Sequence, residues 1–112
     1  MQRDPQYLRD ILDSANRIMG YAHGLNREQF LRDIQKQDAV IRRLEIMGEA
    51  AKRLSKTTLA AMPTIDWKHM KGMRDVLIHD YDDIEAERLW DTIEVFLPSL
   101  VTVVKQYLDD CK

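Results

Sequence analysis

Apolar residues recur every three or four positions along most of the chain, and this spacing predicts helices throughout. The first such segment follows Asp4 and Pro5, which predicts an N-cap at Asp4 and the first helical position at Pro5. Gly24 is expected to end this helix, because glycine is favoured just beyond helix C-termini. The inward positions of the segment are Leu8, Ile11, Leu12, Ala15, Ile18, Met19 and Ala22.

A second helical stretch is predicted to begin at Asn26, since Gln29 stands three residues later and completes a capping box. Its apolar face continues toward Leu54, as one long helix or as two helices joined near Gln37. The apolar positions of this stretch are Phe30, Leu31, Ile34, Val40, Ile41, Leu44 and Met47.

The stretch "SKTTLAAMPT" interrupts the pattern, and Pro63 argues against a continuous helix through it. Asp66 is the next predicted N-cap and opens a helix from residue 67 to about residue 79. A last helix is expected from near residue 85 toward residue 108, with a kink where Pro98 removes a backbone donor. Its inward residues are Leu89, Trp90, Ile93, Leu97, Leu100 and Val104.

These elements predict an all-α bundle of four or five helices that forms one domain over residues 1–112. The length suits a single core, and 32% charged with 45% hydrophobic residues fits a folded globular chain. The longest uncharged run, residues 95–104, is too short to span a membrane, and "MQRDPQ" has no apolar region of a secretory signal. Cys111 is the single cysteine, so we expect no internal disulfide, a cytoplasmic location and an inert thiol.

The net charge of −2 predicts no polyanion partner by itself, but the charges are unevenly distributed. Residues 42–74 contain eight Lys or Arg and three acids, whereas residues 75–94 contain eight acids and one Arg. Either these are solvated helix faces, or a basic surface that holds phosphate adjoins an acidic one that docks a basic partner. The sequence shows no stacking platform for bases. The candidate phosphate contacts are Lys52, Arg53, Lys56 and Lys71.

The segment "GMRDVLIHDY" places polar residues inside an otherwise apolar helix. At about 100° per residue, Arg74 shares one side with Trp67, Met70, Met73, Leu77 and Tyr81, whereas His79 lies on another side with Asp75, Lys71 and Gly72. Arg74 and His79 are then roughly 140° apart and cannot form one compact site on a single helix. Read separately, Arg74 either extends its charged end to solvent or pairs with a carboxylate of the preceding helix such as Glu45 or Glu49. His79, read in the same way, is a surface residue near a helix C-terminus.

A second copy of the chain changes this chemistry, because two-fold symmetry can bring Arg74, His79 and their mates into one cleft. Metal-free RNA cleavage needs a base for the 2′-OH proton, a cation for the phosphate and an acid for the leaving 5′-oxygen. Two histidines suit the proton transfers, and the planar fork of arginine suits a phosphate.

"RDVLIHDY" fits the motif of Arg, four residues, His, any residue and Tyr, and the chain resembles the HEPN superfamily, specifically its HepT-like toxin branch. Supporting stretches are "YLRDIL", "QDAVIRRLEIMGEAAKRLS", "PTIDWKHMKGMRD" and "ERLW" followed by "FLPSL", in the expected order over most of the chain. The resemblance implies a HEPN-like helical homodimer that acts as a metal-independent endoribonuclease, with Arg74 and His79 lining the cleft between protomers.

The same resemblance implies that this ribonuclease is the toxin of a type VII-like toxin–antitoxin pair. The partner would be a small nucleotidyltransferase of the MntA type, which transfers AMP from ATP onto the motif tyrosine, here Tyr81. ATP and Mg²⁺ would serve that partner, so no cofactor or metal is expected in this chain. Asp75 stands where relatives most often have Asn, and we expect it to hydrogen-bond His79 and raise the pKa of that ring. Glu49 is the expected partner of Arg74.

Two other interpretations remain open from the residues. "HDYDD" suggests a metal-dependent phosphohydrolase, but metal sites draw several ligands from different elements, and His23 and His69 have no companion motif. His23 is expected at a helix end and His69 on the surface. The other interpretation is a non-catalytic helical dimer that binds nucleotide or the nucleotidyltransferase partner.

Overall fold

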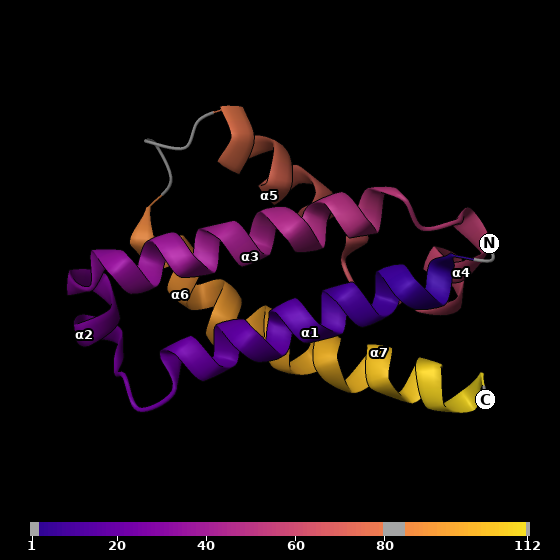
Figure 1. The fold of residues 1–112 in the computed structure, drawn as a ribbon, viewed down its shortest axis with the longest axis horizontal. Helices are drawn as coiled ribbons and strands as arrows, with labels where there is room; N and C mark the ends of the chain where they lie inside the picture. The colour runs from indigo at the N-terminus through magenta and orange to yellow at the C-terminus, as the bar shows by residue number, and fades with distance from the viewer. Residues whose placement is uncertain (1–2, 80–84, 112) are drawn as a thin grey trace.

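A computed structural model describes residues 3–79 and 85–111, with residues 74–79 described as helix but not in their side chains. The described part contains helices and no strand, which confirms the all-α prediction (Figure 1). Seven α-helical segments occur there, more than the four or five predicted, because short helices separate where longer ones were expected. Their order is α1 (Asp4–Ala22), α2 (Arg27–Arg32), α3 (Ile34–Lys52), α4 (Lys56–Ala61), α5 (Trp67–His79), α6 (Ala86–Asp91), the π-helix η2 (Thr92–Phe96) and α7 (Leu97–Asp110).

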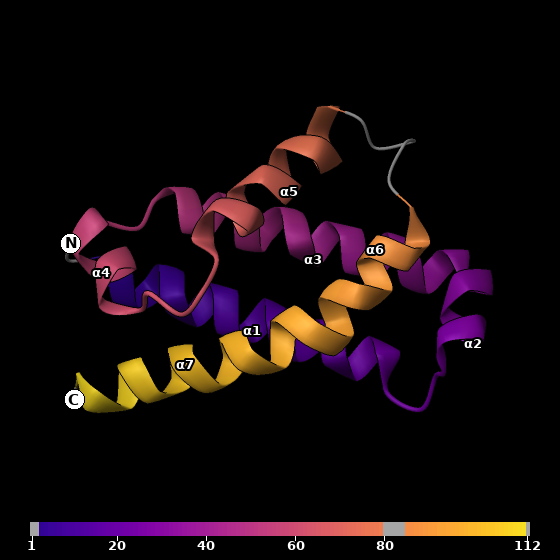
Figure 2. The ribbon, with the colours of Figure 1, turned by 180° about the vertical axis from the view of Figure 1, so that it is seen from behind.

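The long helices α1 and α3 lie side by side in opposite directions, and α5 and α7 pack on this pair (Figure 1). α5 contacts α3, whereas α7 contacts α1. The segments α6, η2 and α7 follow one another without a break. They form one helical rod, which bends between α6 and α7 (Figure 2). No helix among the described residues is long and apolar enough to cross a membrane.

The core lies where these helices meet and contains most of the predicted inward residues. Ile34 is an exception, with 69% of its surface exposed, because it is the first residue of α3 rather than part of a continuous helix. The residues with the largest fully buried side chains include Leu8, Ile11, Ile18, Phe30, Met47, Leu89, Leu97, Leu100 and Val104.

The second predicted stretch is two helices, and they separate at Asp33 rather than near Gln37. The capping box at Asn26 is confirmed, with both reciprocal bonds to Gln29 at 2.9 Å. Asp33 then caps α3 by accepting from the Lys36 backbone N–H at 3.0 Å. The Gln37 amide donates to two carbonyls at the end of α2, at 3.0 and 3.1 Å, which satisfies part of that helix terminus.

The prediction that Asp4 caps α1 is wrong, because Arg3 occupies the N-cap position and Asp4 is the first residue of the helix. The Asp4 carboxylate is 5% exposed and accepts from the hydroxyls of Ser55 and Thr58, each at 2.6 Å. It also accepts from the Ser55 backbone N–H at 3.3 Å, while the Ser55 hydroxyl caps α4. Burial raises the pKa of this carboxyl, but the hydrogen bonds outweigh burial and leave the pKa below its usual value.

Where the sequence predicted a kink at Pro98, the structure has a π-helix, η2, that ends two residues before this proline. Pro98 falls in the first turn of α7, where a missing backbone donor is tolerated. Just before it, the Leu97 N–H donates to the Thr92 carbonyl five residues back, so the helix widens over η2. The predicted inward residues Leu89, Ile93, Leu97, Leu100 and Val104 are buried on both sides of this wider turn.

Candidate functional site

The helix that carries the Arg–His motif is α5, and its bounds match the prediction. Asp66 is confirmed as the cap residue, since its carboxylate accepts from the His69 backbone N–H at 2.9 Å. Trp67, Met70 and Met73 are buried, as predicted for one side of this helix. The Trp67 indole N–H also donates to the Met62 carbonyl at 3.2 Å. The first half of α5 is therefore anchored in the core against α3.

Arg74, Asp75 and His79 lie on the second half of α5, the last of them at its final residue. Their side chains are not among those the structure describes, and neither is that of Leu77. Tyr81 and most of "HDYDD" lie outside the described residues. Residues 74 and 79 are thus placed by helical register alone, about 140° apart around α5. Their roles, and those of Asp75 and Tyr81, stay predictions.

A first hollow of about 410 Å³ lies between α1 and α3, and we call it the α1–α3 hollow. Its lining residues include Tyr7 and Asp10 of α1, Arg42 and Glu49 of α3, and Arg53 just after α3. Arg53 and Glu49 form an ion pair at 3.2 Å, and hydrogen bonds to Tyr7 and Glu49 raise the pKa of Arg53. The predicted pairing of Glu49 with Arg74 stays a prediction.

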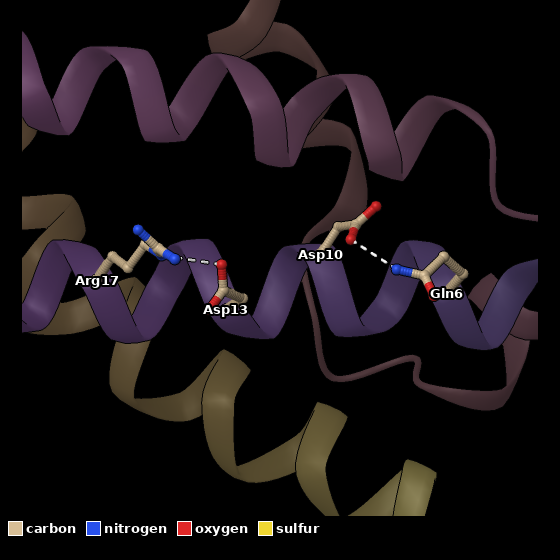
Figure 3. A network of polar contacts seen from close by, with 4 residues as sticks. All are labelled: Gln6, Asp10, Asp13 and Arg17. Carbon is tan, nitrogen blue, oxygen red and sulfur yellow. Dashed lines mark hydrogen bonds and ion pairs between the residues drawn. The ribbon is translucent and has the colours of Figure 1, made fainter.

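Several charged groups lining the α1–α3 hollow are engaged by one another or by neighbouring residues. Arg42 pairs with Glu45 at 3.7 Å, and Gln6 donates to Asp10 at 3.0 Å. Figure 3 shows this last contact on α1, next to the Arg17–Asp13 pair one turn farther along. The hollow therefore offers few groups that still need a partner.

The candidate phosphate contacts do not gather on one element. Lys52 ends α3, Arg53 follows it, and Lys56 begins α4, so these three flank the same connection, with all three side chains exposed. Lys71 lies apart on α5 and is half-buried. Arg53 is already engaged by Glu49.

Sequence reasoning missed a second hollow of about 400 Å³, which lies between α5 and the rod of α6 and η2. We call it the α5–η2 hollow, and its lining residues are His69, Met73, Arg88, Asp91, Thr92, Val95 and Phe96. The rings of His69 and Phe96 meet there with centroids 5.4 Å apart and planes inclined by 59°. His69 is exposed, as predicted, but it is part of an aromatic pair that the sequence did not reveal.

The remaining predictions concern isolated residues. His23 is exposed and caps the end of α1, as predicted, just before Gly24, whose φ of +82° favours glycine. Cys111 is a free and exposed thiol. Among the residues that the structure describes, no three His, Cys, Asp or Glu side chains are grouped as a metal site.

Comparison with known proteins adds to this geometry. The family model described as "Ribonuclease HepT-like" matches residues 11–107, from the middle of α1 to near the end of α7. "Probable ribonuclease HepT" of Thermococcus cleftensis is 40% identical over 94 residues, which cover 84% of this chain and 86% of the relative. No solved structure matches this chain at a significant level.

Two further relatives are named as candidate RNases and are each 35% identical to this chain. The one from Methanocaldococcus jannaschii aligns over 104 residues, covering 93% of this chain and 86% of its own length. The one from Caldanaerobacter subterraneus subsp. tengcongensis aligns over 108 residues, which are 96% of both chains. The resemblance found in the motif of α5 and its flanking stretches is thereby confirmed, and the chain belongs to the HepT-like ribonuclease family.

Proposed function

We propose that this protein is a metal-independent endoribonuclease that works as a homodimer, with Arg74 and His79 of both protomers at the active cleft. The observation that supports it is the Arg–His motif on the second half of α5, in a chain of the HepT-like ribonuclease family. The buried first half of α5 gives that motif a rigid base on α3.

The register of α5 supports a dimer. Positions 74 and 79 are about 140° apart around the helix, which disfavours a compact site made by one protomer alone. A two-fold axis beside α5 puts residue 74 of one copy near residue 79 of the other. In the proposed cleft one imidazole accepts the 2′-OH proton while the 2′-oxygen attacks phosphorus, and Arg74 stabilises the added negative charge. An imidazolium from the partner copy protonates the departing 5′-oxygen, which leaves a 2′,3′-cyclic phosphate and a 5′-hydroxyl.

The proposed biological role is that of a toxin held in check by an MntA-like nucleotidyltransferase. That partner would use ATP and Mg²⁺ to transfer AMP onto the hydroxyl of Tyr81, with release of pyrophosphate. Added phosphate charge beside the cleft would repel the RNA backbone and block its access. Support for this role comes from the Arg–His–Tyr motif and from family membership.

The catalytic proposal is tested with purified protein treated with EDTA and mixed with end-labelled RNA. Intact mass is measured on the same sample to verify that Tyr81 is unmodified. We expect cleavage with 2′,3′-cyclic phosphate ends that falls at least a hundredfold in His79→Ala, because the cleft loses its proton-transfer groups. His23→Ala is the matched control, since it removes an exposed histidine that is far from the motif in sequence.

A folded His79→Ala protein that cleaves RNA as well as wild type would overturn the catalytic assignment. No cleavage by unmodified wild-type protein, across several classes of RNA, would favour the non-catalytic dimer that binds nucleotide or the partner. Sedimentation of the same samples tests the dimer, and a monomer that cleaves RNA at full rate contradicts the shared cleft.

The control by the partner is tested by incubating wild type and Tyr81→Phe with an MntA-like enzyme, ATP and Mg²⁺. We expect an AMP mass increment and lost nuclease activity in wild type only. An increment of the same size on Tyr81→Phe would refute this modification site.

A further inference from the structure

The α5–η2 hollow differs from the α1–α3 hollow in the state of its charged groups. In the described part of the chain, the Arg88 guanidinium and the Asp91 carboxylate have no hydrogen-bond or ion-pair partner, although both line the hollow. They stand three residues apart on α6 and are exposed to solvent. Because the guanidinium donors and the carboxylate acceptors do not bind each other, both groups can bind a ligand.

The floor and wall of this hollow are apolar or aromatic. Met73 is 6% exposed and Phe96 is half-buried, and the His69 ring lies against Phe96. The Thr92 hydroxyl donates to the Arg88 carbonyl at 2.9 Å, so it contributes mainly its methyl group to the surface. Volume and lining are those of a small-ligand site, where an apolar surface carries a few polar groups.

The polar and aromatic residues of this hollow share one face of the α6–η2 segment. Asp91, Thr92 and Phe96 follow Arg88 by three, four and eight residues, a spacing that places them on one side of a helix. The segment passes from α-helix to π-helix between Asp91 and Thr92. Glu94 of the same π-helix lines a different hollow with His23 and Pro98. Widened helical turns of this kind are frequent at functional sites.

A flat heterocycle suits this surface better than a flexible chain does. Stacking on aromatic side chains is how proteins hold unpaired bases of RNA, while polar groups at the edge of the ring read its identity. A carboxylate only accepts hydrogen bonds. Guanine is the base whose Watson–Crick edge offers two adjacent donors, N1–H and the N2 amino group, to a carboxylate such as that of Asp91.

The hollow also adjoins the motif on α5. Met73, one of its lining residues, directly precedes Arg74, and His69 lies on the same helix. At about 1.5 Å of rise per residue, His69 is roughly 7.5 Å along the axis from Arg74. A base in the hollow would therefore belong to a nucleotide close to a phosphate at residue 74.

We propose that the α5–η2 hollow is a guanine subsite, in which the base lies against Phe96 and His69, Asp91 accepts from its Watson–Crick edge and Arg88 faces the phosphate. This inference rests on the proposed ribonuclease function for the claim that the guanine is part of an RNA substrate. The subsite determines where the RNA is cut, and its residues are specificity-determining rather than catalytic.

The subsite is tested first without any cleavage, by titrating the protein with 5′-GMP, 5′-AMP, 5′-CMP and 5′-UMP while the Met73 methyl signal is followed by NMR. We expect 5′-GMP to shift that signal at the lowest concentration. Asp91→Asn should weaken 5′-GMP binding about tenfold, because an amide offers a donor to one of the two guanine donors. Glu94→Gln is the matched control, since it removes an exposed carboxylate three residues after Asp91, on η2, that lies outside this hollow.

Phe96→Leu keeps an apolar side chain and removes the ring, so it tests stacking with little risk to folding. We expect it to weaken binding of all four nucleotides while leaving their order unchanged. Equal shifts by all four nucleotides in wild type, or unchanged 5′-GMP binding by Asp91→Asn, would overturn the guanine assignment.

Cleavage sites mapped on an RNA of random sequence give the second test. Wild type should cut with a guanine enriched at one fixed position, and Asp91→Asn should lose this enrichment while still cutting. Cleavage without that enrichment refutes the subsite and leaves the ribonuclease proposal standing. A wild type that binds 5′-GMP in the hollow but cleaves no RNA refutes the ribonuclease proposal and leaves the guanine site standing.

Discussion

At the junction of α1 and α4, the Asp4 carboxylate is buried and accepts hydrogen bonds from Ser55 and Thr58. In the α5–η2 hollow, the Asp91 carboxylate is exposed and has no partner among the described residues. The same functional group thus joins two segments about 50 residues apart in one region and is available to a ligand in the other. Burial and hydrogen bonding, rather than residue type, determine whether a charged side chain stabilises the fold or is available to a ligand.

The largest effect we expect from this difference is on stability. Asp4→Ala should lower the free energy of unfolding by about 3 kcal/mol, because it removes the acceptor of several hydrogen bonds and leaves buried donors unpaired. Asp91→Ala should change it by less than about 0.5 kcal/mol, as is usual for exposed positions. Urea unfolding of both variants measures the two changes in the free energy of unfolding. Similar losses of stability in the two variants would contradict the difference between the two sites.

Two buried threonines sharpen the comparison, since valine keeps their shape and removes only the hydroxyl. Thr58→Val should cost about 2 kcal/mol, because its hydroxyl donates to a carboxylate at 2.6 Å. Thr92→Val should cost less than about 1 kcal/mol, because its hydroxyl donates to the neutral carbonyl of Arg88. Thermal unfolding of the two variants shows which one loses more stability. A larger loss in Thr92→Val than in Thr58→Val would contradict the prediction.

The smallest expected effect is the dependence of stability on pH, because it reports only the change in the Asp4 pKa on folding. This pKa is lowered in the folded chain, so the carboxylate contributes stability above the pKa of the unfolded chain, about 4. That contribution is lost as the pH falls through the folded pKa. The stability difference between wild type and Asp4→Asn should therefore shrink from pH 6 toward pH 3. A difference that stays constant over this range, measured by urea unfolding, contradicts the lowered pKa.

Local rules predicted those features of the fold whose causes lie within a few residues. The capping box of Asn26 and the cap at Asp66 each depend on a partner three residues away, and both are confirmed. Asp4 looked like a cap by the same rule, but partners that lie 51 and 54 residues away in sequence draw its carboxylate elsewhere. Ile34 fitted the apolar period and is exposed, because the chain turns at Asp33.

The candidate site also has a part that the sequence could predict and a part that it could not. The Arg74–His79 motif could be read from its spacing and its resemblance to a family, and the family is confirmed. The α5–η2 hollow could not be found this way, because His69 and Phe96 come from segments far apart in sequence and meet only after folding.

The π-helix holds about one residue more between α6 and α7 than an ordinary helical turn would hold. Deletion of one residue within η2 would restore an ordinary α-helix and leave α6 and α7 close to their present orientation, because the narrower turn makes up the rotation of the lost residue. Insertion of one further residue would instead turn α7 by about 100° relative to α6. Either Leu97, Leu100 and Val104 would then leave the core, or α6 would turn away from α5 and take Arg88 and Asp91 with it. The connection between α6 and α7 should therefore tolerate the loss of one residue better than the gain of one.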